Sequence, residues 1–147
     1  MVTTCGKFAF GLGAFAAFAL AAGSASADPC TAIPDRGPPP AWIKPGAQFS
    51  GLVWYVGDGD SICVGATGDP STWVEVRLED FYAPELSEPG GSAAKAVMER
   101  LAAGQTATCQ VTTTGRRISY DRVVATCRVR GRDLADQMRE QGVVENR

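Results

Sequence analysis

The sequence contains no histidine among its 147 residues. This absence excludes Ser-His-Asp and Cys-His nucleophile systems, histidine acid–base pairs and metal sites built on imidazole. The formal net charge is only −2, from 14 basic and 16 acidic residues, so the chain as a whole has no strong positive charge for clamping nucleic acid. Any chemistry must therefore use carboxylates, arginines, hydroxyls, thiols or a metal ion.

The first 27 residues are typical of a secretory signal peptide. Lys7 precedes a nearly unbroken apolar run from Phe8 to Ala22, and Ala25-Ser26-Ala27 is a small-x-small cleavage site. The apolar run has roughly 15 residues, whereas a membrane span needs about 20; a retained N-terminal anchor is the alternative. We expect a protein that is exported to the periplasm or outside the cell, with no stable membrane association after cleavage.

Four cysteines follow the predicted cleavage site, and none of them forms a CxxC pair. A zinc or redox motif is therefore disfavoured, and an even number in a small exported domain favours two disulfides, although three pairings are possible. Cys109 and Cys127 lie in strand-like runs on either side of one hairpin. This placement predicts a Cys109–Cys127 bridge, with Cys30–Cys63 fixing the N-terminal arm; reactive thiols are the alternative.

The full chain is 45% hydrophobic and 20% charged, which fits one small globular domain. The part after residue 27 divides into an arm and that domain. Six prolines in residues 28–47 predict an extended arm, because that density disfavours helix and central strand. The periodicity of residues 48–147 predicts strands at about 49–56, 61–64, 72–81, 105–113 and 119–129, with helices from Ser92 to Gly104 and at 133–140. This order suits a small five-stranded barrel with a helix inserted after the third strand and a short C-terminal helix.

Charge is distributed unevenly along this domain. Residues 28–99 carry four basic and eleven acidic side chains, whereas residues 116–147 carry eight arginines and five acids. An acidic first part and an arginine-rich last part would suit a site that combines a metal ion with anion-binding arginines. Ordinary solvated strand faces are the alternative.

Four short motifs carry candidate chemistry: Asp58-Gly59-Asp60, Arg77-Leu78, Ala83-Pro84-Glu85 and Tyr120-Asp121-Arg122. Asp58 and Asp60 face the same way in an extended chain and can hold a hard cation such as calcium. Arg77 and Arg122 can grip a phosphate with forked donors and stabilise the charge that develops during attack. Glu85 follows a proline bend and can orient or deprotonate a water molecule. Together these groups predict phosphodiester hydrolysis.

Each motif alone also has an ordinary structural explanation. The two aspartates can be turn formers, Arg77 an exposed strand residue, Glu85 a loop carboxylate, and Asp121-Arg122 a surface ion pair of little energetic weight. Their order along the chain is the more specific observation. DGDS at 58–61, RL at 77–78, APE at 83–85 and an arginine at 122 after a tyrosine-containing turn resemble the staphylococcal-nuclease-like (thermonuclease) family.

The resemblance covers about residues 49–144 and implies a fold and a set of roles. It implies an OB-fold, that is, a five-stranded Greek-key barrel with an inserted helix. It implies that Arg77, Glu85 and Arg122 are catalytic and that Asp60 binds Ca²⁺ or another divalent cation. We add Asp58 and the backbone carbonyl of Ala83 as candidate metal ligands. The implied substrate is single-stranded or double-stranded DNA or RNA, and we expect a monomer.

Two positions depart from the family pattern. Tyr82 stands where the family has a second calcium-binding aspartate, and a neutral phenol is a poorer ligand for calcium than a carboxylate. Asp80 is displaced along the strand by about 7 Å, so Asp58 is the better candidate to restore the charge. Asp121 stands where the family has glycine. The leading hypothesis is a secreted, metal-assisted endonuclease; the alternative is a weakly active or inactive module that binds nucleic acid, polysaccharide or a protein partner.

Overall fold

The computed structural model describes residues 28–34 and 36–146. The predicted signal peptide, residues 1–27, lies outside the described residues and stays a prediction. Within the described part of the chain, no helix has both the length and the apolar character needed to cross a membrane.

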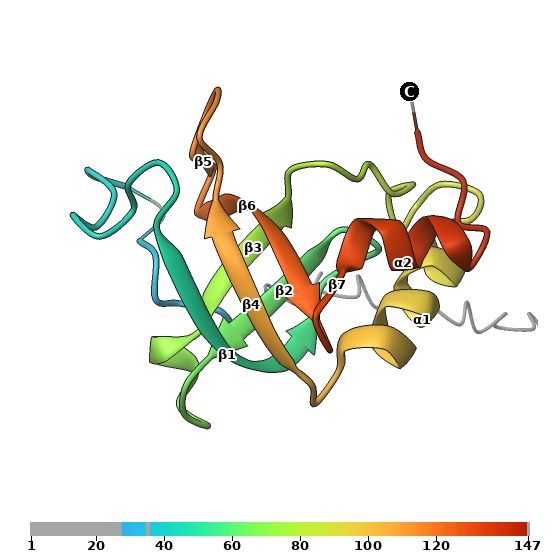
Figure 1. Cartoon of the computed structure of the whole chain (residues 1–147), viewed down its shortest axis with the longest axis horizontal. Coiled ribbons are helices and arrows are strands. Elements are labelled where there is room, and N and C mark those ends of the chain that lie inside the picture. Colours follow the sequence, from blue (N-terminus) through green and yellow to red (C-terminus); the bar gives the residue numbers. More distant parts are fainter. Residues whose placement is uncertain (1–27, 35, 147) are drawn as a thin grey trace, which may run out of the picture.

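The structure is mostly β, with a closed five-stranded barrel and two helices (Figure 1). The barrel strands are β1 (Gln48–Val56), β2 (Ser61–Gly65), β3 (Val74–Leu78), β4 (Thr106–Val111) and β6 (Arg122–Val129). They follow the order β3-β2-β1-β4-β6, and a parallel pairing of β3 with β6 closes the sheet on itself. The architecture is consistent with an OB-like barrel and confirms the predicted five-stranded barrel.

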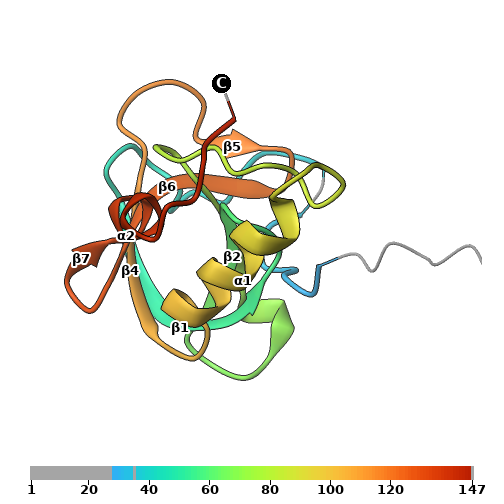
Figure 2. The same cartoon turned by 90° about the vertical axis from the view of Figure 1, so that its right-hand side faces the viewer.

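Shorter elements complete the chain: η1 (Pro70–Thr72), α1 (Gly91–Ala102), β5 (Ile118–Ser119), β7 (Arg132–Asp133) and α2 (Leu134–Glu140). Both short strands pair with β6, so the sheet has seven strands of which five form the barrel. In Figure 2 the barrel is seen end-on, with α1 across its mouth. Met98 of α1 and Leu134 and Met138 of α2 are fully buried, so both helices close the core.

The barrel interior follows the alternation of the strands. On β4 and β6 the inward positions are fully buried, whereas the outward ones are partly or fully exposed. The inward residues of these two strands are Ala107, Cys109, Val111, Val123, Ala125, Cys127 and Val129. Residues that point outward from β3 and β6 are therefore the ones available to build a site.

Several boundaries differ from the sequence prediction, among them the end of the third strand at Leu78, and three of the differences have a local reason. The third strand begins at Val74, because η1 precedes it and its N-cap Asp69 accepts a hydrogen bond from the N–H of Ser71. The last strand is divided, because Tyr120 has a φ of 62° and turns the chain between β5 and β6. The helix begins at Gly91 and not at Ser92, and it has no side-chain cap because its N-cap residue is Gly90. Position 91 itself requires glycine, since a Cβ there would lie 1.9 Å from the carbonyl oxygen of Glu85.

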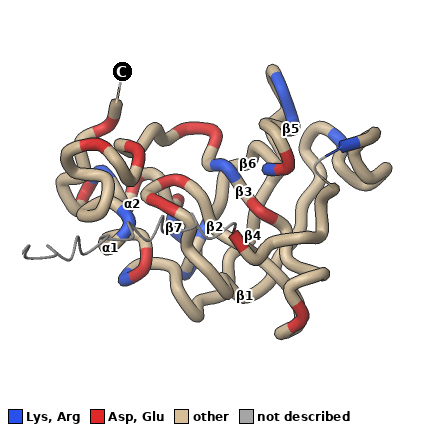
Figure 3. Tube along the Cα trace, turned by 180° about the vertical axis from the view of Figure 1, so that it is seen from behind, with Lys and Arg blue, Asp and Glu red and all other residues tan. Residues whose placement is uncertain are grey.

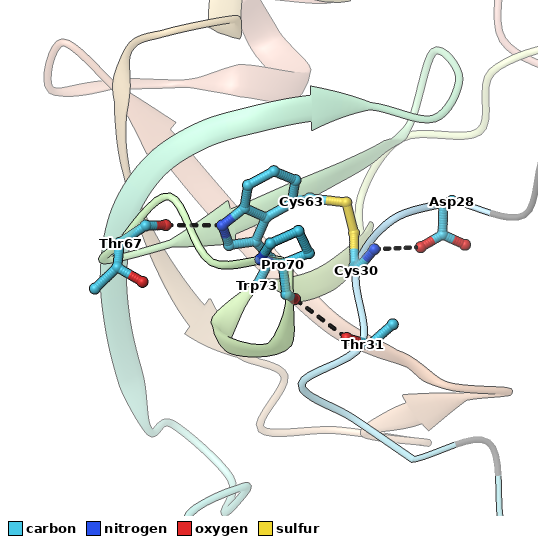
Figure 4. Close-up of a disulfide and its surroundings, with 7 residues drawn as sticks. All are labelled: Asp28, Cys30, Thr31, Cys63, Thr67, Pro70 and Trp73. Atoms are coloured by element: carbon cyan, nitrogen blue, oxygen red, sulfur yellow. Dashed lines mark hydrogen bonds between the residues drawn. A yellow bond between two sulfur atoms is a disulfide. The ribbon is translucent and has the colours of Figure 1, made fainter.

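Both predicted disulfides are present, Cys30–Cys63 and Cys109–Cys127. Cys109 lies directly opposite Cys127 in the β4–β6 ladder. The Cys30–Cys63 bridge joins the arm to β2 and packs against Trp73 (Figure 4). Two disulfides in a small domain are typical of proteins from oxidising compartments.

The arm is packed against the barrel along part of its length. The N–H of Thr31 donates to the carbonyl of Pro70 at 3.2 Å, and that of Ala32 donates to the carbonyl of Trp73 at 3.1 Å. Ile33 and Ile43 are buried in the main core. Part of the segment 28–47 is thus packed into the domain, although its proline content alone predicted an extended arm.

Candidate functional site

The Asp58-Gly59-Asp60 segment forms the turn between β1 and β2. The Oδ1 of Asp58 accepts a hydrogen bond from the N–H of Asp60 at 2.9 Å, a local bond that aspartate favours in turns. A Cβ on Gly59 would lie 2.5 Å from the Cβ of Ala83 and 2.7 Å from that of Ala94. Only glycine fits this approach, so the turn packs directly against the segment that follows β3.

Asp60 is a buried carboxylate with two close partners. It is 5% exposed, and its Oδ2 lies 2.6 Å from the Nη1 of Arg77 and accepts a hydrogen bond from the N–H of Ala83 at 2.8 Å. Burial raises the pKa of Asp60 to about 7, because desolvation outweighs the attraction of Arg77, and the nearby charge of Asp58 raises it further. The turn, β3 and the Ala83 segment therefore meet at this carboxylate.

Arg77 is held in place from several sides. Its position on β3 is opposite Ser61 of β2. Besides the ion pair with Asp60, its Nη1 donates to the carbonyl of Phe81 at 2.9 Å. Its guanidinium carbon lies 5.1 Å from the centre of the Tyr82 ring, a cation–π distance. These contacts fix the guanidinium at the surface beside β6.

A hollow of about 300 Å³ lies next to this guanidinium. It is lined by Arg77, Leu78, Glu79, Tyr82, Arg116, Ser119 and Val124. The polar lining consists of two arginines, one serine hydroxyl and Glu79, whose carboxylate accepts a hydrogen bond from the hydroxyl of Thr112. With two positive charges against one negative charge, the partly apolar hollow suits an anionic ligand with an apolar part. A second hollow, of about 400 Å³ between α1 and residues 141–146, has no charged side chain in its lining and offers no such chemistry.

Glu85 follows Pro84 at the bend before α1. Its N–H donates to the Oε2 of Glu88 at 2.8 Å, and its carbonyl accepts a hydrogen bond from the N–H of Glu88. The Glu85 side chain is exposed, and its carboxylate makes no hydrogen bond or ion pair within residues 28–34 and 36–146. The fold thus fixes the backbone at Glu85 and leaves its carboxylate open to solvent.

Arg122 begins β6 on the outer face of the barrel. Val123 is paired with Val76 of β3 and points inward, so Arg122 lies beside Glu75 on the outside. Its guanidinium carbon is 6.0 Å from the centre of the exposed Tyr120 ring. Arg77 occupies the same outer face two residues after Glu75. Figure 3 shows basic and acidic segments gathered where β3, β5 and β6 meet.

The structure therefore brings some of the predicted site residues into contact and leaves others apart. Direct contacts link Asp58, Asp60, Arg77 and Ala83. Arg122 shares the outer face with Arg77 but neighbours Glu75, and Glu85 is exposed beyond the bend. Comparison of the sequence with protein-family models gives no match, and comparison with curated proteins gives none either.

Glu75 is the residue that the sequence motifs did not single out. It lies on the polar face of β3 and yet is only 8% exposed. Burial raises the pKa of Glu75 to about 8, and the charges of Asp28 and Asp121 raise it further while Arg122 opposes them. The alternation of β3 places Glu75 and Arg77 on one face of the strand. The arm that covers Glu75 is far away in the sequence, so the strand pattern alone did not indicate its burial.

Asp80 does not join this site. Burial raises the pKa of Asp80 above its ordinary value, and the nearby charge of Asp133 raises it further. The Oδ1 of Asp80 is buried and has no hydrogen-bond partner in the described chain. Its backbone carbonyl accepts a hydrogen bond from Arg139, on the side of α2. The Asp80 carboxylate therefore lies among charges of α2 and its N-cap and does not replace the family's aspartate at Tyr82.

Replacing Asp80 with Asn is expected to stabilise the protein at pH 8. The folded-state pKa is raised, so the contribution of Asp80 to stability is present at low pH and is lost as the pH rises through that pKa. The Asn variant should have a higher free energy of unfolding than wild type at pH 8 and a free energy close to that of wild type at pH 4. Urea denaturation at both pH values measures this, with the exposed Glu99→Gln as the matched control. An equal effect at both pH values would contradict the assignment.

Proposed function

We propose that the protein is an exported, divalent-metal-assisted nuclease of the staphylococcal-nuclease-like type. Its barrel would then be a Greek-key OB-fold, with α1 as the helix inserted between the third and fourth barrel strands. The observation that carries the proposal is the contact of Asp60 with both Arg77 and the N–H of Ala83. Three motifs that are separated in the sequence meet there, in the order that the family resemblance implies.

The arginines supply the phosphate-binding part of the mechanism. Arg77 and Arg116 line one hollow, and Arg122 lies on the adjoining outer face. A guanidinium group can donate two parallel hydrogen bonds to phosphate oxygens, and it stabilises the negative charge that builds up when a nucleophile attacks phosphorus. Because Arg77 is already oriented by Asp60 and Phe81, little reorganisation accompanies substrate binding.

Glu85 is the proposed general base. Its carboxylate is exposed and uncommitted in the described chain, so it can accept a proton from a water molecule beside the bound phosphate. The hydrogen bonds between the Glu85 backbone and Glu88 keep the bend in place. Proton transfer to Glu85 produces the hydroxide that attacks phosphorus and displaces the leaving oxygen.

The donor chemistry around Asp60 fits a hard divalent cation. Asp58 and Asp60 repel each other, which contributes to the raised pKa of Asp60, and a cation between them would offset both that repulsion and the burial. Asp58, Asp60 and the carbonyl of Ala83 are the groups proposed to hold calcium or another divalent ion. Such an ion, when bound, supplies electrophilic activation of a phosphate oxygen.

A cleavage assay tests the proposal. The purified protein is incubated with single-stranded DNA, double-stranded DNA and RNA, in calcium, magnesium, manganese or chelator. Cleavage should require a divalent ion and fall by about 100-fold or more in Glu85→Gln and in Arg122→Ala. The exposed Glu99→Gln and Arg128→Ala variants are matched controls and should cleave like wild type. Cleavage that survives in chelator, or in both site variants, would refute the mechanism.

A second candidate is a binding module that keeps the barrel without cleaving its ligand. Tyr82 favours it, because a neutral ring lies on Arg77 where the family has a calcium-binding carboxylate. Binding of nucleic acid without cleavage in every metal would support this candidate. The Tyr82→Asp variant distinguishes the two further, since an added carboxylate should raise calcium affinity and any calcium-dependent rate only when the site is the proposed one.

A further inference from the structure

Three carboxylates from distant parts of the chain meet on the outer face of the barrel. They are Asp28 in the arm, Glu75 on β3 and Asp121 before β6, and one oxygen of each lies within 4.8 Å of those of the other two. None of them belongs to the Asp58–Asp60 turn. Acidic side chains often gather at surfaces, so the surroundings of this group decide what it does.

Glu75 is the group that distinguishes this cluster from an ordinary acidic surface. It is more than nine-tenths buried, and its carboxylate has no hydrogen bond or ion pair within residues 28–34 and 36–146. Ionisation of a carboxyl group at such a largely buried position is unfavourable, and two further carboxylates beside it add to the cost, as its raised pKa reflects. Arg122 is the opposing charge nearby, and no ion pair joins it to Glu75 among these residues.

The covalent structure holds the cluster together. Glu75 is paired with Cys63 across the β2–β3 ladder, and Cys63 is bonded to Cys30. The Oδ1 of Asp28 in turn accepts a hydrogen bond from the N–H of Cys30 at 3.0 Å (Figure 4). The disulfide therefore holds Asp28 near Glu75, so these two carboxylates are brought together by covalent and hydrogen-bonded contacts.

We propose that Asp28, Glu75 and Asp121 form a second divalent-cation site, separate from Asp58 and Asp60, that prefers calcium. Calcium binds oxygen at about 2.3–2.6 Å, so ligand atoms on opposite sides of the ion lie up to about 5 Å apart. The spacing of the three carboxylates is within that range. Magnesium usually takes one or two carboxylates and keeps several waters, which suits this cluster less well.

Softer metals do not fit the same place. The sulfur atoms of Cys30 and Cys63 also lie near Asp28, but they are joined in a disulfide and offer no thiolate. The available donors are then carboxylate oxygens alone, which are the ligands that hard cations take. A bound calcium would pin the N-terminal arm to β3 and to the start of β6.

Calcium binding to the full purified protein tests this site independently of nuclease activity. Chelator-treated D60N protein, in which the Asp58–Asp60 site is weakened, is compared with D60N/E75Q by equilibrium dialysis and calorimetry. D60N should bind about one calcium per chain, and E75Q should weaken this binding by about 100-fold or more. Calcium should also raise the Tm of D60N and leave that of D60N/E75Q unchanged, while Glu99→Gln in the same background behaves like D60N.

The glutamine variant has a built-in check on folding. Since it removes a carboxyl group whose ionisation is unfavourable at this position, its Tm without calcium should equal or exceed that of D60N. Equal calcium binding by D60N and D60N/E75Q, or no calcium binding by D60N, would overturn the proposal. A protein that binds calcium in this way but cleaves no nucleic acid would refute the proposed function and leave the second site standing.

Discussion

Arg77→Ala is expected to lower the proposed nuclease activity by about 100- to 1,000-fold, the range seen when one group that stabilises transition-state charge is removed. Arg77 forms an ion pair with the proposed metal ligand Asp60, and its side chain also lines the adjoining hollow. Its loss removes a proposed hydrogen-bond donor to the phosphate and also the ion-pair partner of the buried Asp60 carboxylate. Single-turnover cleavage of a labelled oligonucleotide at saturating enzyme measures the loss in the chemical step.

The Arg77→Ala variant should lose less free energy of unfolding than is usual when one partner of a buried ion pair is removed. Burial already raises the pKa of Asp60 to about 7, so without Arg77 the carboxyl group takes up a proton and does not remain as an unpaired charge. The hydrogen bond to Phe81 and the contact with Tyr82 are lost as well. We expect a decrease of about 1–3 kcal/mol in the free energy of unfolding.

Two variants test the role assigned to Arg77. Arg77→Lys keeps the charge but loses the forked geometry and should recover only part of the activity. Arg128→Ala removes an exposed arginine from β6 and should leave both activity and stability near wild type. A folded Arg77→Ala protein that cleaves at the wild-type rate would place the phosphate elsewhere.

Replacing Cys30 and Cys63 with alanine should have the largest effect on stability. The bridge closes a loop of 33 residues, for which the loss of chain entropy in the unfolded state corresponds to about 4 kcal/mol. The two sulfurs and Trp73 also form a small buried cluster, which the variant leaves underpacked. Urea denaturation under non-reducing conditions, with midpoint and slope fitted separately, gives the change.

The matched control is the Cys109→Ala/Cys127→Ala variant. Its bridge spans 18 residues and should contribute about 3 kcal/mol, so both variants are destabilised. Only the loss of Cys30–Cys63 releases Asp28 from Glu75, and only that variant should lose the calcium-dependent rise in Tm. If the Cys109–Cys127 variant lost that rise equally, the disulfide would not be what positions Asp28.

The sequence predicted the barrel well where two strands alternate cleanly. On β4 and β6 each inward position carries a small or β-branched apolar residue or cysteine, so strand and disulfide could be inferred together. Prediction failed where a local backbone choice decided the boundary. The positive φ of Tyr120 and the 3₁₀ turn Pro70–Thr72 depend on contacts that periodicity does not contain.

For the candidate site, the motif order indicated which groups to examine, and the contacts of Asp60 join three of the motifs. Glu75 could not be recognised as special, because its burial comes from the packed arm and the disulfide. The exposed carboxylate of Glu85 and the placement of Arg122 beside Glu75 likewise depend on tertiary packing. Motifs specify chemistry, whereas burial and neighbours are set by segments far away in the chain.

The parallel pairing of β3 with β6 bears on when the proposed activity can exist. This pairing closes the barrel and joins strands that are distant in sequence, so it forms only after the intervening chain has folded back. Arg77 and Arg122 lie on opposite sides of that seam. Under the proposed function, a newly synthesised chain therefore has no assembled phosphate-binding surface until the seam closes.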